Sequence, residues 1–306
     1  MIPAQDAIAK LSRALGGSDA AALAAAALVE ADAMGQPRFG ISMLDEWTSD
    51  ASPPPVANGS RAVAWLDCTG SFAPLAVASA TLDLAQTAKQ LGIGAVFLRG
   101  VRGFGRFAPF LRPLADSGLI ALAGAEGPPF VAPHGGTRPV VGTNPLAFAM
   151  GRGDDRVIID AASSSMTMAD IRSARAQDRP LPAGSAVDAA GAPTNVAADV
   201  AALLPRGGQI GSLLGLVVEL MAGVAAGGRG DPKGRGVFLV AIDPTVAGEE
   251  TGWQDKLAAL RNDWTGAGGH WPRGGGLAPD ATLDDDFRDR LDAYLGKMPS
   301  EAGGAQ

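Results

Sequence analysis

The pattern of apolar and polar residues along the chain changes from one long helical segment to alternating strand-like and helix-like runs. Ser18 and Asp19 precede an alanine-rich apolar segment that ends at Gly35, which predicts a capped helix. After the prolines at 53–55, the pattern predicts strands at 61–66, 93–98 and 119–123, and helices at 80–91 and 107–116. This alternation favours an α/β fold.

The second half of the chain contains shorter apolar runs at 140–150 and 156–162, without long helices between them. A long helix is expected from Ile210, a buried strand over Gly236–Pro244, and amphipathic helices around 253–264 and 283–295. The segment 213–228 is the most membrane-like, but it is short and contains Glu219, so we expect a buried helix. The glycine- and proline-rich stretch 266–279 predicts a loop, and the tail 299–306 is expected to be disordered.

Composition restricts the possible functions. The 306 residues suggest about two domains, and 47% apolar with 19% charged residues is ordinary for a globular protein. The net charge is −7 without a basic cluster, so we expect no nucleic-acid partner. Cys68 is the single cysteine, which excludes an intramolecular disulfide and fits a reducing, cytoplasmic location. The N-terminus does not resemble a signal peptide, and two histidines without a Cys/His ligand set predict no metal site.

A glycine-rich loop follows the strand expected at 93–98. Its residues Gly103 to Ala108 fit the pattern G-x-G-x-x-A, and Glu126 ends the next expected strand. Such a loop can cradle a pyrophosphate at a helix N-terminus. Because 42 of the 306 residues are glycine, chance matches are common, and an ordinary tight turn is an equally good interpretation.

Five blocks nearly cover the chain in a recognisable order. They read PPFVAPHGGTRPVVGTNPLAFAM from Pro128, VIIDAASS from Val157, LPAGSAVDAAGAPT from Leu181, LLPRGGQIGSLLGLVVELMAGVAAG from Leu203 and VFLVAIDP from Val237. Together they resemble the malate/L-lactate dehydrogenase-like family, which includes ureidoglycolate and sulfolactate dehydrogenases and cyclic ketimine reductases. The resemblance implies an α/β fold of non-Rossmann type with a cofactor-binding central domain at 61–235. An N-terminal helical segment, 1–60, would pack with a C-terminal segment, 236–306, that supplies dimer contacts.

The resemblance also implies site residues. The family motif HFGxxGxY falls on the glycine-rich loop, so its catalytic histidine, the proton donor to the carbonyl or imine, corresponds to Gly103. The family's SHGxxR motif corresponds to a segment in which Arg38, Phe39 and Met43 replace Ser, His and Arg. Its nucleotide-binding lysine in GGHKG corresponds to Ile210, preceded by Gln209.

These correspondences give one set of candidates for each role. We expect Asp188 to be catalytic, and Arg38, Phe39, Met43, Arg102 and Gly103 to bind a substrate that carries a carboxylate. The residues expected to bind NADPH or NADH are Gly142, Thr143, Asn144, Pro145, Asp160, Ser163, Ser164, Gln209 and Ile210. Plainer alternatives remain open: Asp160 and Asp188 could cap loops, 142–145 could be a simple turn, and the arginines could be surface charges.

Two hypotheses for function follow. The first is an NAD(P)H-dependent oxidoreductase with altered chemistry, because a cyclic imine arrives protonated or takes its proton from water and needs a catalytic histidine less than a 2-oxo acid does. The second is a catalytically degenerate member that acts as a binding protein or as the partner subunit of an intact paralogue. Both imply a homodimer by resemblance, and a lyase or isomerase using the same pocket is a third hypothesis.

Overall fold

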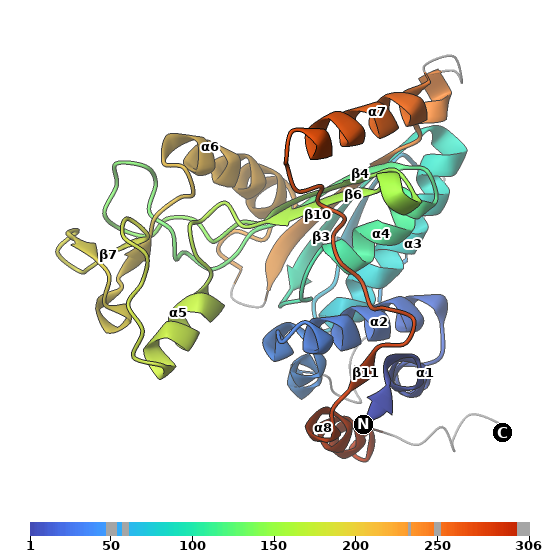
Figure 1. Cartoon of the computed structure of the whole chain (residues 1–306), viewed down its shortest axis with the longest axis horizontal. Helices are drawn as coiled ribbons and strands as arrows, with labels where there is room; N and C mark the ends of the chain where they lie inside the picture. The colour runs from blue at the N-terminus through green and yellow to red at the C-terminus, as the bar shows by residue number, and fades with distance from the viewer. Residues whose placement is uncertain (47–53, 57–60, 232–233, 248–251, 299–306) are drawn as a thin grey trace.

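The computed structural model describes residues 1–46, 54–56, 61–231, 234–247 and 252–298. A six-stranded sheet with the order β2–β3–β10–β4–β5–β6 forms the central layer (Figure 1). Its strands are β2 (Val63–Asp67), β3 (Ile93–Val101), β4 (Ile120–Ala125), β5 (Leu146–Met150), β6 (Val157–Ala161) and β10 (Arg235–Ile242). Only β2 and β3 pair in parallel among these neighbours. The α/β fold expected from the alternating pattern is confirmed.

One face of this sheet carries α3 (Ala73–Leu91) and α4 (Ala108–Asp116). Side chains alternate between the two faces of each strand, so Val96, Leu98 and Leu239 pack in the same core as Leu84 and Leu111 from the helices. The strand β10, expected to open a separate C-terminal segment, lies between β3 and β4 in the middle of the sheet. Its apolar run gave no indication of that position, since strand order is a long-range property.

A second layer contains the two ends of the described chain. Here α1 (Ala4–Ala14) and α2 (Asp19–Ala33) lie beside α8 (Asp285–Leu295), and β1 (Ile2–Pro3) pairs with β11 (Thr282–Leu283) (Figure 1). The Ser18 hydroxyl accepts a hydrogen bond from the Ala21 N–H, so α2 begins with the predicted cap. An ion pair of 3.0 Å between Arg290 and Asp32 also joins the two ends of the chain.

A smaller lobe lies at one end of the sheet, on the left of Figure 1. It contains α5 (Met168–Ala176) and a three-stranded sheet of β7 (Ala186–Val187), β8 (Pro193–Thr194) and β9 (Ala202–Leu203). Val131, Ile171 and Leu203 contribute to its own core. The sequence pattern did not predict these strands, because two-residue strands leave no periodic signal. Short 3₁₀ helices complete the fold at η1 (Pro37–Phe39), η2 (Ile41–Glu46), η3 (Gly153–Asp155), η4 (Ala197–Asp199) and η6 (Pro244–Ala247).

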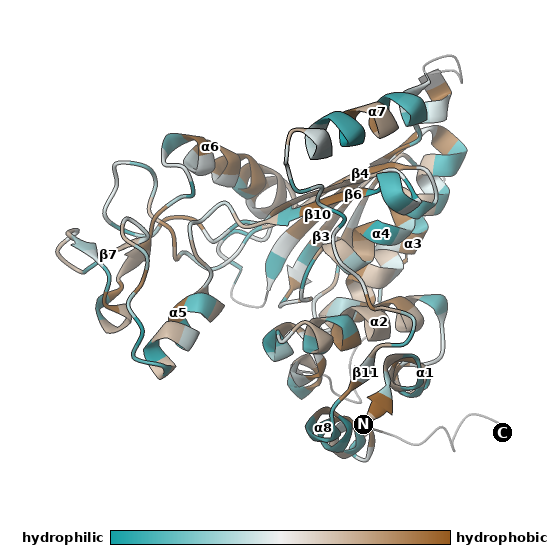
Figure 2. Ribbon diagram, viewed as in Figure 1, coloured by the Kyte–Doolittle hydropathy of each residue, from teal (hydrophilic) through white to brown (hydrophobic). Residues whose placement is uncertain are grey.

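The long apolar helix is not buried in this chain, contrary to the sequence interpretation. It consists of α6 (Gln209–Val218) followed by a π-helical stretch, η5 (Glu219–Ala225), and its hydrophobic residues colour parts of the α6 ribbon brown in Figure 2. The exposed side chains on these two elements, here called the α6–η5 face, are Ile210, Leu213, Leu214, Leu216, Val217, Leu220 and Val224, each 45% to 71% exposed. Only Gly211, Gly215, Val218, Glu219, Ala222 and Gly223 are buried there.

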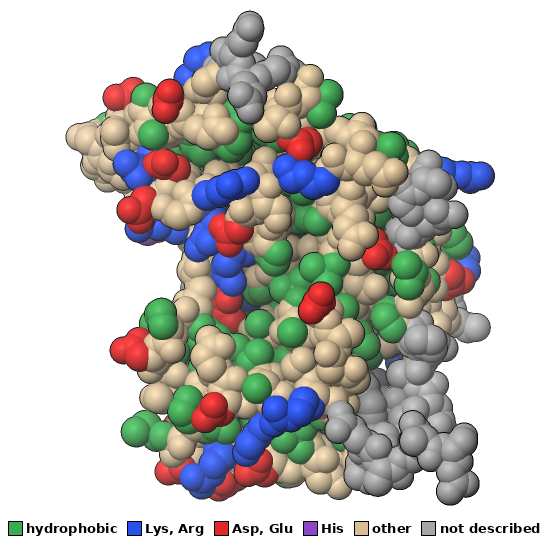
Figure 3. Space-filling view, turned by 90° about the vertical axis from the view of Figure 1, so that its right-hand side faces the viewer, with side chains coloured by type: hydrophobic (Ala, Val, Ile, Leu, Met, Phe, Trp, Pro, Cys, Tyr) green, Lys and Arg blue, Asp and Glu red, His purple; other side chains and the backbone are tan. Residues whose placement is uncertain are grey.

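A further helix packs on the central sheet. The helix α7 (Trp253–Gly266) lies over β5 and β6 through Trp253 and Leu257. Acidic and basic side chains are intermingled on the face shown in Figure 3, without a continuous basic area on that face among the described residues. None of the described helices is long and apolar enough to cross a membrane.

Candidate functional site

A large pocket opens between three parts of the molecule: the layer that contains the two ends of the described chain, here called the N-terminal layer, one end of the central sheet, and the smaller lobe. Its volume is about 890 Å³, within the range of small-molecule sites. The side chains discussed below come from η1 and η2 (Arg38, Phe39, Met43), the loop after β3 (Gly103, Arg106, Phe107), the segment before β5 (Thr143, Pro145), the end of β6 (Asp160) and α5 (Arg172). We call this cavity the main pocket. It brings together residues that are far apart in the sequence.

Asp160 holds the glycine-rich loop in place. Its Oδ2 accepts hydrogen bonds from the N–H groups of Phe107 at 2.9 Å and Ala108 at 3.0 Å, at the start of α4. Burial raises the pKa of this carboxyl, while the two backbone donors and the nearby Arg106 charge oppose that rise. The capping interpretation of Asp160 therefore describes its geometry. A pyrophosphate could not use these N–H groups without displacing Asp160, which argues against a phosphate cradle here.

The same loop crosses the 3₁₀ helices of the N-terminal layer. Gly105 has φ +96°, and a Cβ there would lie 3.2 Å from the Phe39 carbonyl oxygen, so this position favours glycine. The backbone of Gly103 is not in the left-handed region. Within 4 Å, a Cβ added there would meet Met43 Cε alone, at 3.8 Å. There is open space at Gly103, and its near neighbour is Met43.

Asn144 supports the wall formed by Thr143 and Pro145. Its side chain is fully buried, its φ is +35°, and its Nδ2 donates to the Gly215 carbonyl at 3.0 Å and to Glu219 Oε2 at 2.9 Å. Its Oδ1 accepts from the Gly127 N–H at 3.1 Å. The Asn144 side chain thus uses its hydrogen-bonding capacity inside the protein and holds the wall, instead of facing the pocket.

The other expected cofactor residues divide into two groups. Ser163 and Ser164 are buried behind the wall, where the Ser163 hydroxyl donates to the Thr143 carbonyl at 2.9 Å and that of Ser164 donates to the Met166 carbonyl. Gly142 packs against Gly127 so closely that a Cβ at 142 would lie 2.5 Å from the Gly127 Cα. Gln209 and Ile210 form the first turn of α6, away from the pocket lining, and Ile210 is 71% exposed.

Two further candidates lie outside the main pocket. Asp188 accepts hydrogen bonds of 2.9 Å from the N–H groups of Ala190 and Ala192 in its own turn, which is the loop-fixing geometry considered from the sequence. Arg102 is exposed and does not line the pocket. Sequence reasoning missed Arg106, which does line it, although the residue stands inside the quoted G-x-G-x-x-A motif. The signal was an arginine in an otherwise small or apolar loop.

Glu126 is another buried acid at this end of the sheet. Its carboxylate accepts from the Gly236 N–H at 3.3 Å, and burial raises its pKa, with the Glu219 charge adding to the effect. Among the described residues, no group of three or more His, Cys, Asp or Glu side chains is arranged to hold a metal ion. The described lining of the main pocket contains three carboxyl groups, from Asp45, Glu126 and Asp160, and no His, Lys, Tyr or Cys.

Comparison with known proteins identifies the fold. The family model described as malate/L-lactate dehydrogenase matches residues 4–270. The chain belongs to this family. A Δ1-pyrroline-2-carboxylate/Δ1-piperideine-2-carboxylate reductase from Pseudomonas syringae pv. tomato is 33% identical over 240 residues, which is 77% of this chain and 68% of the relative.

Two further matches agree with this assignment. A (2R)-3-sulfolactate dehydrogenase (NADP⁺) from Chromohalobacter salexigens is 31% identical over 262 residues, covering 78% of each chain. The crystal structure of Δ1-piperideine-2-carboxylate reductase from P. syringae superposes with a TM-score of 0.80 at 28% identity, over 96% of this chain and 99% of that one. All of these matches are named as enzymes, so the comparisons do not favour the degenerate alternative.

Proposed function

We propose that this protein is a nicotinamide-dependent reductase of small cyclic imines that carry a carboxylate. The observation that carries the proposal is the described lining of the main pocket, which offers no His, Lys, Tyr or Cys as a proton donor and has open space at Gly103. Its buried carboxyls, Asp160 and Glu126, accept hydrogen bonds from the backbone N–H groups of neighbouring elements. A protonated imine brings its own proton, whereas a 2-oxo acid needs one delivered to the carbonyl oxygen. Relatives named as reductases of Δ1-pyrroline-2-carboxylate and Δ1-piperideine-2-carboxylate support the same substrate class.

In this proposal the main pocket holds the nicotinamide end of the dinucleotide together with a small substrate. Its volume is about 890 Å³, and Gly127 leaves part of the wall without a side chain. A reduced nicotinamide would supply a hydride to the imine carbon; the C=N π electrons then become the nitrogen lone pair, and the nitrogen keeps its proton. The Thr143–Pro145 wall would position the nicotinamide, and Gly142, Ser163 and Ser164 would hold that wall from behind.

Three apolar side chains of the main pocket also have a role in this proposal. Phe39, Met43 and Phe107 would exclude water from the reacting carbon, which slows hydrolysis of the imine and strengthens electrostatic interactions. Gln209 and Ile210 are proposed to meet the distant part of the cofactor at the start of α6. Whether Asp188 acts on the substrate is tested by Asp188→Asn, which keeps an acceptor for its turn; a specific loss of kcat with an unchanged thermal midpoint would support a catalytic role.

We also propose a homodimer that buries the α6–η5 face, and a reducing cytoplasm as the working compartment. The face presents seven large apolar side chains on one surface. Isolated exposed apolar residues are normal, but a continuous group of this size commonly marks an interface. The negative net charge of the chain argues against a nucleic-acid partner.

The decisive experiment has two stages. NADH and NADPH are first titrated against the protein by fluorescence or calorimetry, and Δ1-piperideine-2-carboxylate and pyruvate are then assayed side by side. We expect one dinucleotide to bind and the imine to be reduced faster than the ketone. If neither dinucleotide binds, the hypothesis of a catalytically degenerate family member is favoured. Rapid reduction of pyruvate would show that another group supplies the proton.

A further inference from the structure

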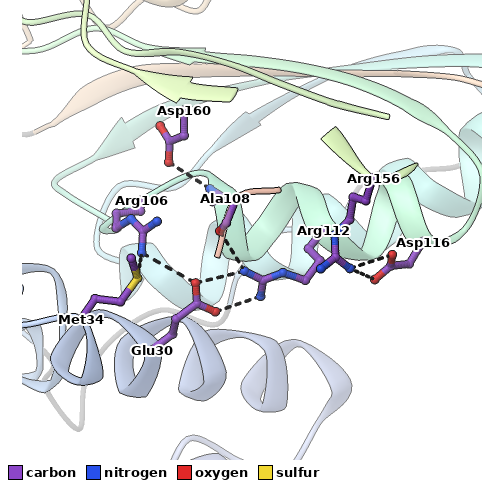
Figure 4. Close-up of polar contacts among 9 residues, drawn as sticks. Glu30, Met34, Arg106, Ala108, Arg112, Asp116, Arg156 and Asp160 are labelled. Carbon is purple, nitrogen blue, oxygen red and sulfur yellow. Dashed lines mark hydrogen bonds and ion pairs between the residues drawn. The ribbon is translucent and has the colours of Figure 1, made fainter. Parts of the chain in front are cut away.

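One buried glutamate is shared by two arginines next to the main pocket. Glu30, on α2, is 3% exposed, and Arg112 of α4 binds it with two hydrogen bonds of 2.8 and 3.0 Å (Figure 4). Arg106 Nη1 lies 3.6 Å from Glu30 Oε1, which is an ion pair but too long for a hydrogen bond. Both oxygens of Glu30 are therefore engaged by Arg112, and Arg106 is left with weakly used donors.

Arg106 occupies an unusual position for a basic side chain. It lines the main pocket from the loop before α4, and its side chain is only 17% exposed. In Figure 4 its guanidinium contacts both Glu30 and Met34, on the side of the loop where Asp160 caps α4. Asp160 attracts Arg106 electrostatically, but its Oδ2 is bound to the backbone of α4 instead. Two guanidinium groups thus share one fully paired carboxylate.

We propose that Arg106 binds the anionic oxygens of the ligand in the main pocket, and that these oxygens are the carboxylate of the substrate. A partly buried guanidinium forms stronger charge-assisted hydrogen bonds than one in water. Arg38 and Arg172 also line the pocket but are exposed, where a single ion pair contributes little. The Glu30–Arg112 pair restricts the Arg106 side chain before the ligand arrives, which reduces the ordering cost of binding.

The neighbours of Arg106 indicate why such a residue is needed. Phe39, Met43 and Phe107 make this part of the pocket apolar, so a carboxylate entering it would lose water. A buried anion is stable there only when a cation and hydrogen-bond donors replace that water. Arg106 is the most buried of the three arginines in the described lining, and it supplies both.

A phosphate is the other source of the same chemistry, because NADPH carries a 2′-phosphate that an arginine could also bind. The two sources give different results in Arg106→Gln. A substrate carboxylate predicts weaker binding of the substrate with unchanged binding of NADPH. A cofactor phosphate predicts weaker binding of NADPH relative to NADH, with unchanged binding of the substrate.

The direct test uses pyrrole-2-carboxylate, a flat ring acid that cannot be reduced, with pyrrole as the matched ring without a carboxylate. Calorimetry is performed on the full-length wild type, Arg106→Gln and Arg106→Lys, with and without bound dinucleotide. We expect Arg106→Gln to weaken pyrrole-2-carboxylate binding by about ten- to a hundredfold, the effect of one lost charge-assisted contact. Arg106→Lys should fall between, because it keeps the charge and loses the planar fork.

Arg156→Gln is the matched control. Arg156 pairs with Asp116 at the opposite end of α4, its side chain is 21% exposed, and it does not line the main pocket (Figure 4). Its substitution should leave pyrrole-2-carboxylate binding unchanged. Thermal midpoints of all variants show whether a change reflects misfolding, and Arg106→Lys provides a second measurement if Arg106→Gln proves unstable.

The inference rests on the proposed function, but the two can fail separately. A wild type that binds pyrrole-2-carboxylate through Arg106 and reduces no imine would refute the reductase proposal alone. Equal affinities of folded Arg106→Gln and wild type for pyrrole-2-carboxylate would overturn the role of Arg106, as would a loss of NADPH binding alone. In steady-state assays, the role of Arg106 predicts a raised KM for Δ1-pyrroline-2-carboxylate and no comparable change for 1-pyrroline, which lacks the carboxylate.

Discussion

The substitution Gly103→His would place a proton donor in a pocket whose described lining contains neither histidine nor lysine. The backbone at Gly103 is not left-handed, so a side chain introduces no backbone strain there. Its Cβ would meet Met43 Cε alone within 4 Å, at 3.8 Å, and this atom ends a flexible side chain. An imidazole can therefore enter with little repacking of the loop.

The expected gain depends on the substrate. A positioned general acid typically contributes about 10²- to 10⁴-fold, which corresponds to roughly 3 to 5 kcal/mol of barrier. A ketone such as pyruvate should receive much of this gain, because its oxygen must be protonated as the hydride arrives. A protonated cyclic imine should gain less than about tenfold, since its nitrogen already carries the proton.

The assay compares kcat/KM for pyruvate and for Δ1-piperideine-2-carboxylate in the wild type and in Gly103→His, across the pH range in which histidine titrates. Gly103→Ala is the control for added volume without an acid. The ratio of ketone to imine reduction should rise only in Gly103→His, and the ketone rate should fall as pH rises through the histidine pKa near 6.5. Equal ratios in all three proteins would refute the reasoning, because the space at Gly103 would then not adjoin the reacting atoms.

Three further predictions concern assembly, cofactor and acid stability. Leu220→Lys should convert a homodimer to a monomer in light scattering at micromolar concentration, because Leu220 is 51% exposed on the α6–η5 face and each such leucine contributes about 1 kcal/mol when buried; a strictly monomeric wild type would contradict this. Ile210→Lys should tighten dinucleotide binding by about ten- to a hundredfold through one charge-assisted contact, and an unchanged affinity would mean that α6 does not meet the cofactor. Lys89 lies 2.7 Å from Asp243 and its hydrogen bond lowers the pKa of that carboxyl from 3.8 to about 2. This depressed pKa stabilises the fold above 3.8 and the effect is lost as pH falls toward about 2, so Asp243→Asn should be less stable at neutral pH by about 1 kcal/mol and no less stable near pH 2 in urea unfolding.

The regular elements of the fold were predictable because local signals determine them. The Ser18 cap with Gly35 defined α2, and the apolar runs at 93–98 and 236–244 correspond to β3 and β10. The position of β10 between β3 and β4 could not be predicted, since pairing depends on contacts across more than a hundred residues. The apolar pattern of α6 predicted a buried helix instead of a membrane span, but it could not show what covers the helix. Within this chain the outer face of α6 has no cover among the described residues.

The order of the family-like motifs predicted part of the candidate site, whereas residue types alone predicted little of it. Motif order led to the loop at Gly103 and to the wall at Thr143 and Pro145, which do line one pocket. Arg106 and its partner Glu30 were missed, because the two residues lie on different elements and no sequence spacing connects them. For Asp160 the residue type suggested cofactor binding or acid–base chemistry, but in the structure its carboxylate accepts hydrogen bonds from the backbone N–H groups at the start of α4.

Asn144 offers a last test, because its neutral amide donates a hydrogen bond to the buried carboxylate of Glu219. Asn144→Asp would place a carboxylate where Nδ2 now lies 2.9 Å from Glu219 Oε2. Two such carboxylates raise the pKa of one of them in the folded state. The folded protein then binds a proton that the unfolded chain releases, so the variant should be destabilised at neutral pH by about 2–4 kcal/mol and should recover as pH falls through that raised pKa.

Asn144→Gly is the control, since it keeps the freedom for a φ of +35° and removes the amide without adding a charge. Its destabilisation should not be relieved by acid in the same way. Thermal unfolding of both variants against pH measures the difference, and an Asn144→Asp protein as stable as the wild type at neutral pH would show that Glu219 is not held where the hydrogen bond to Asn144 places it.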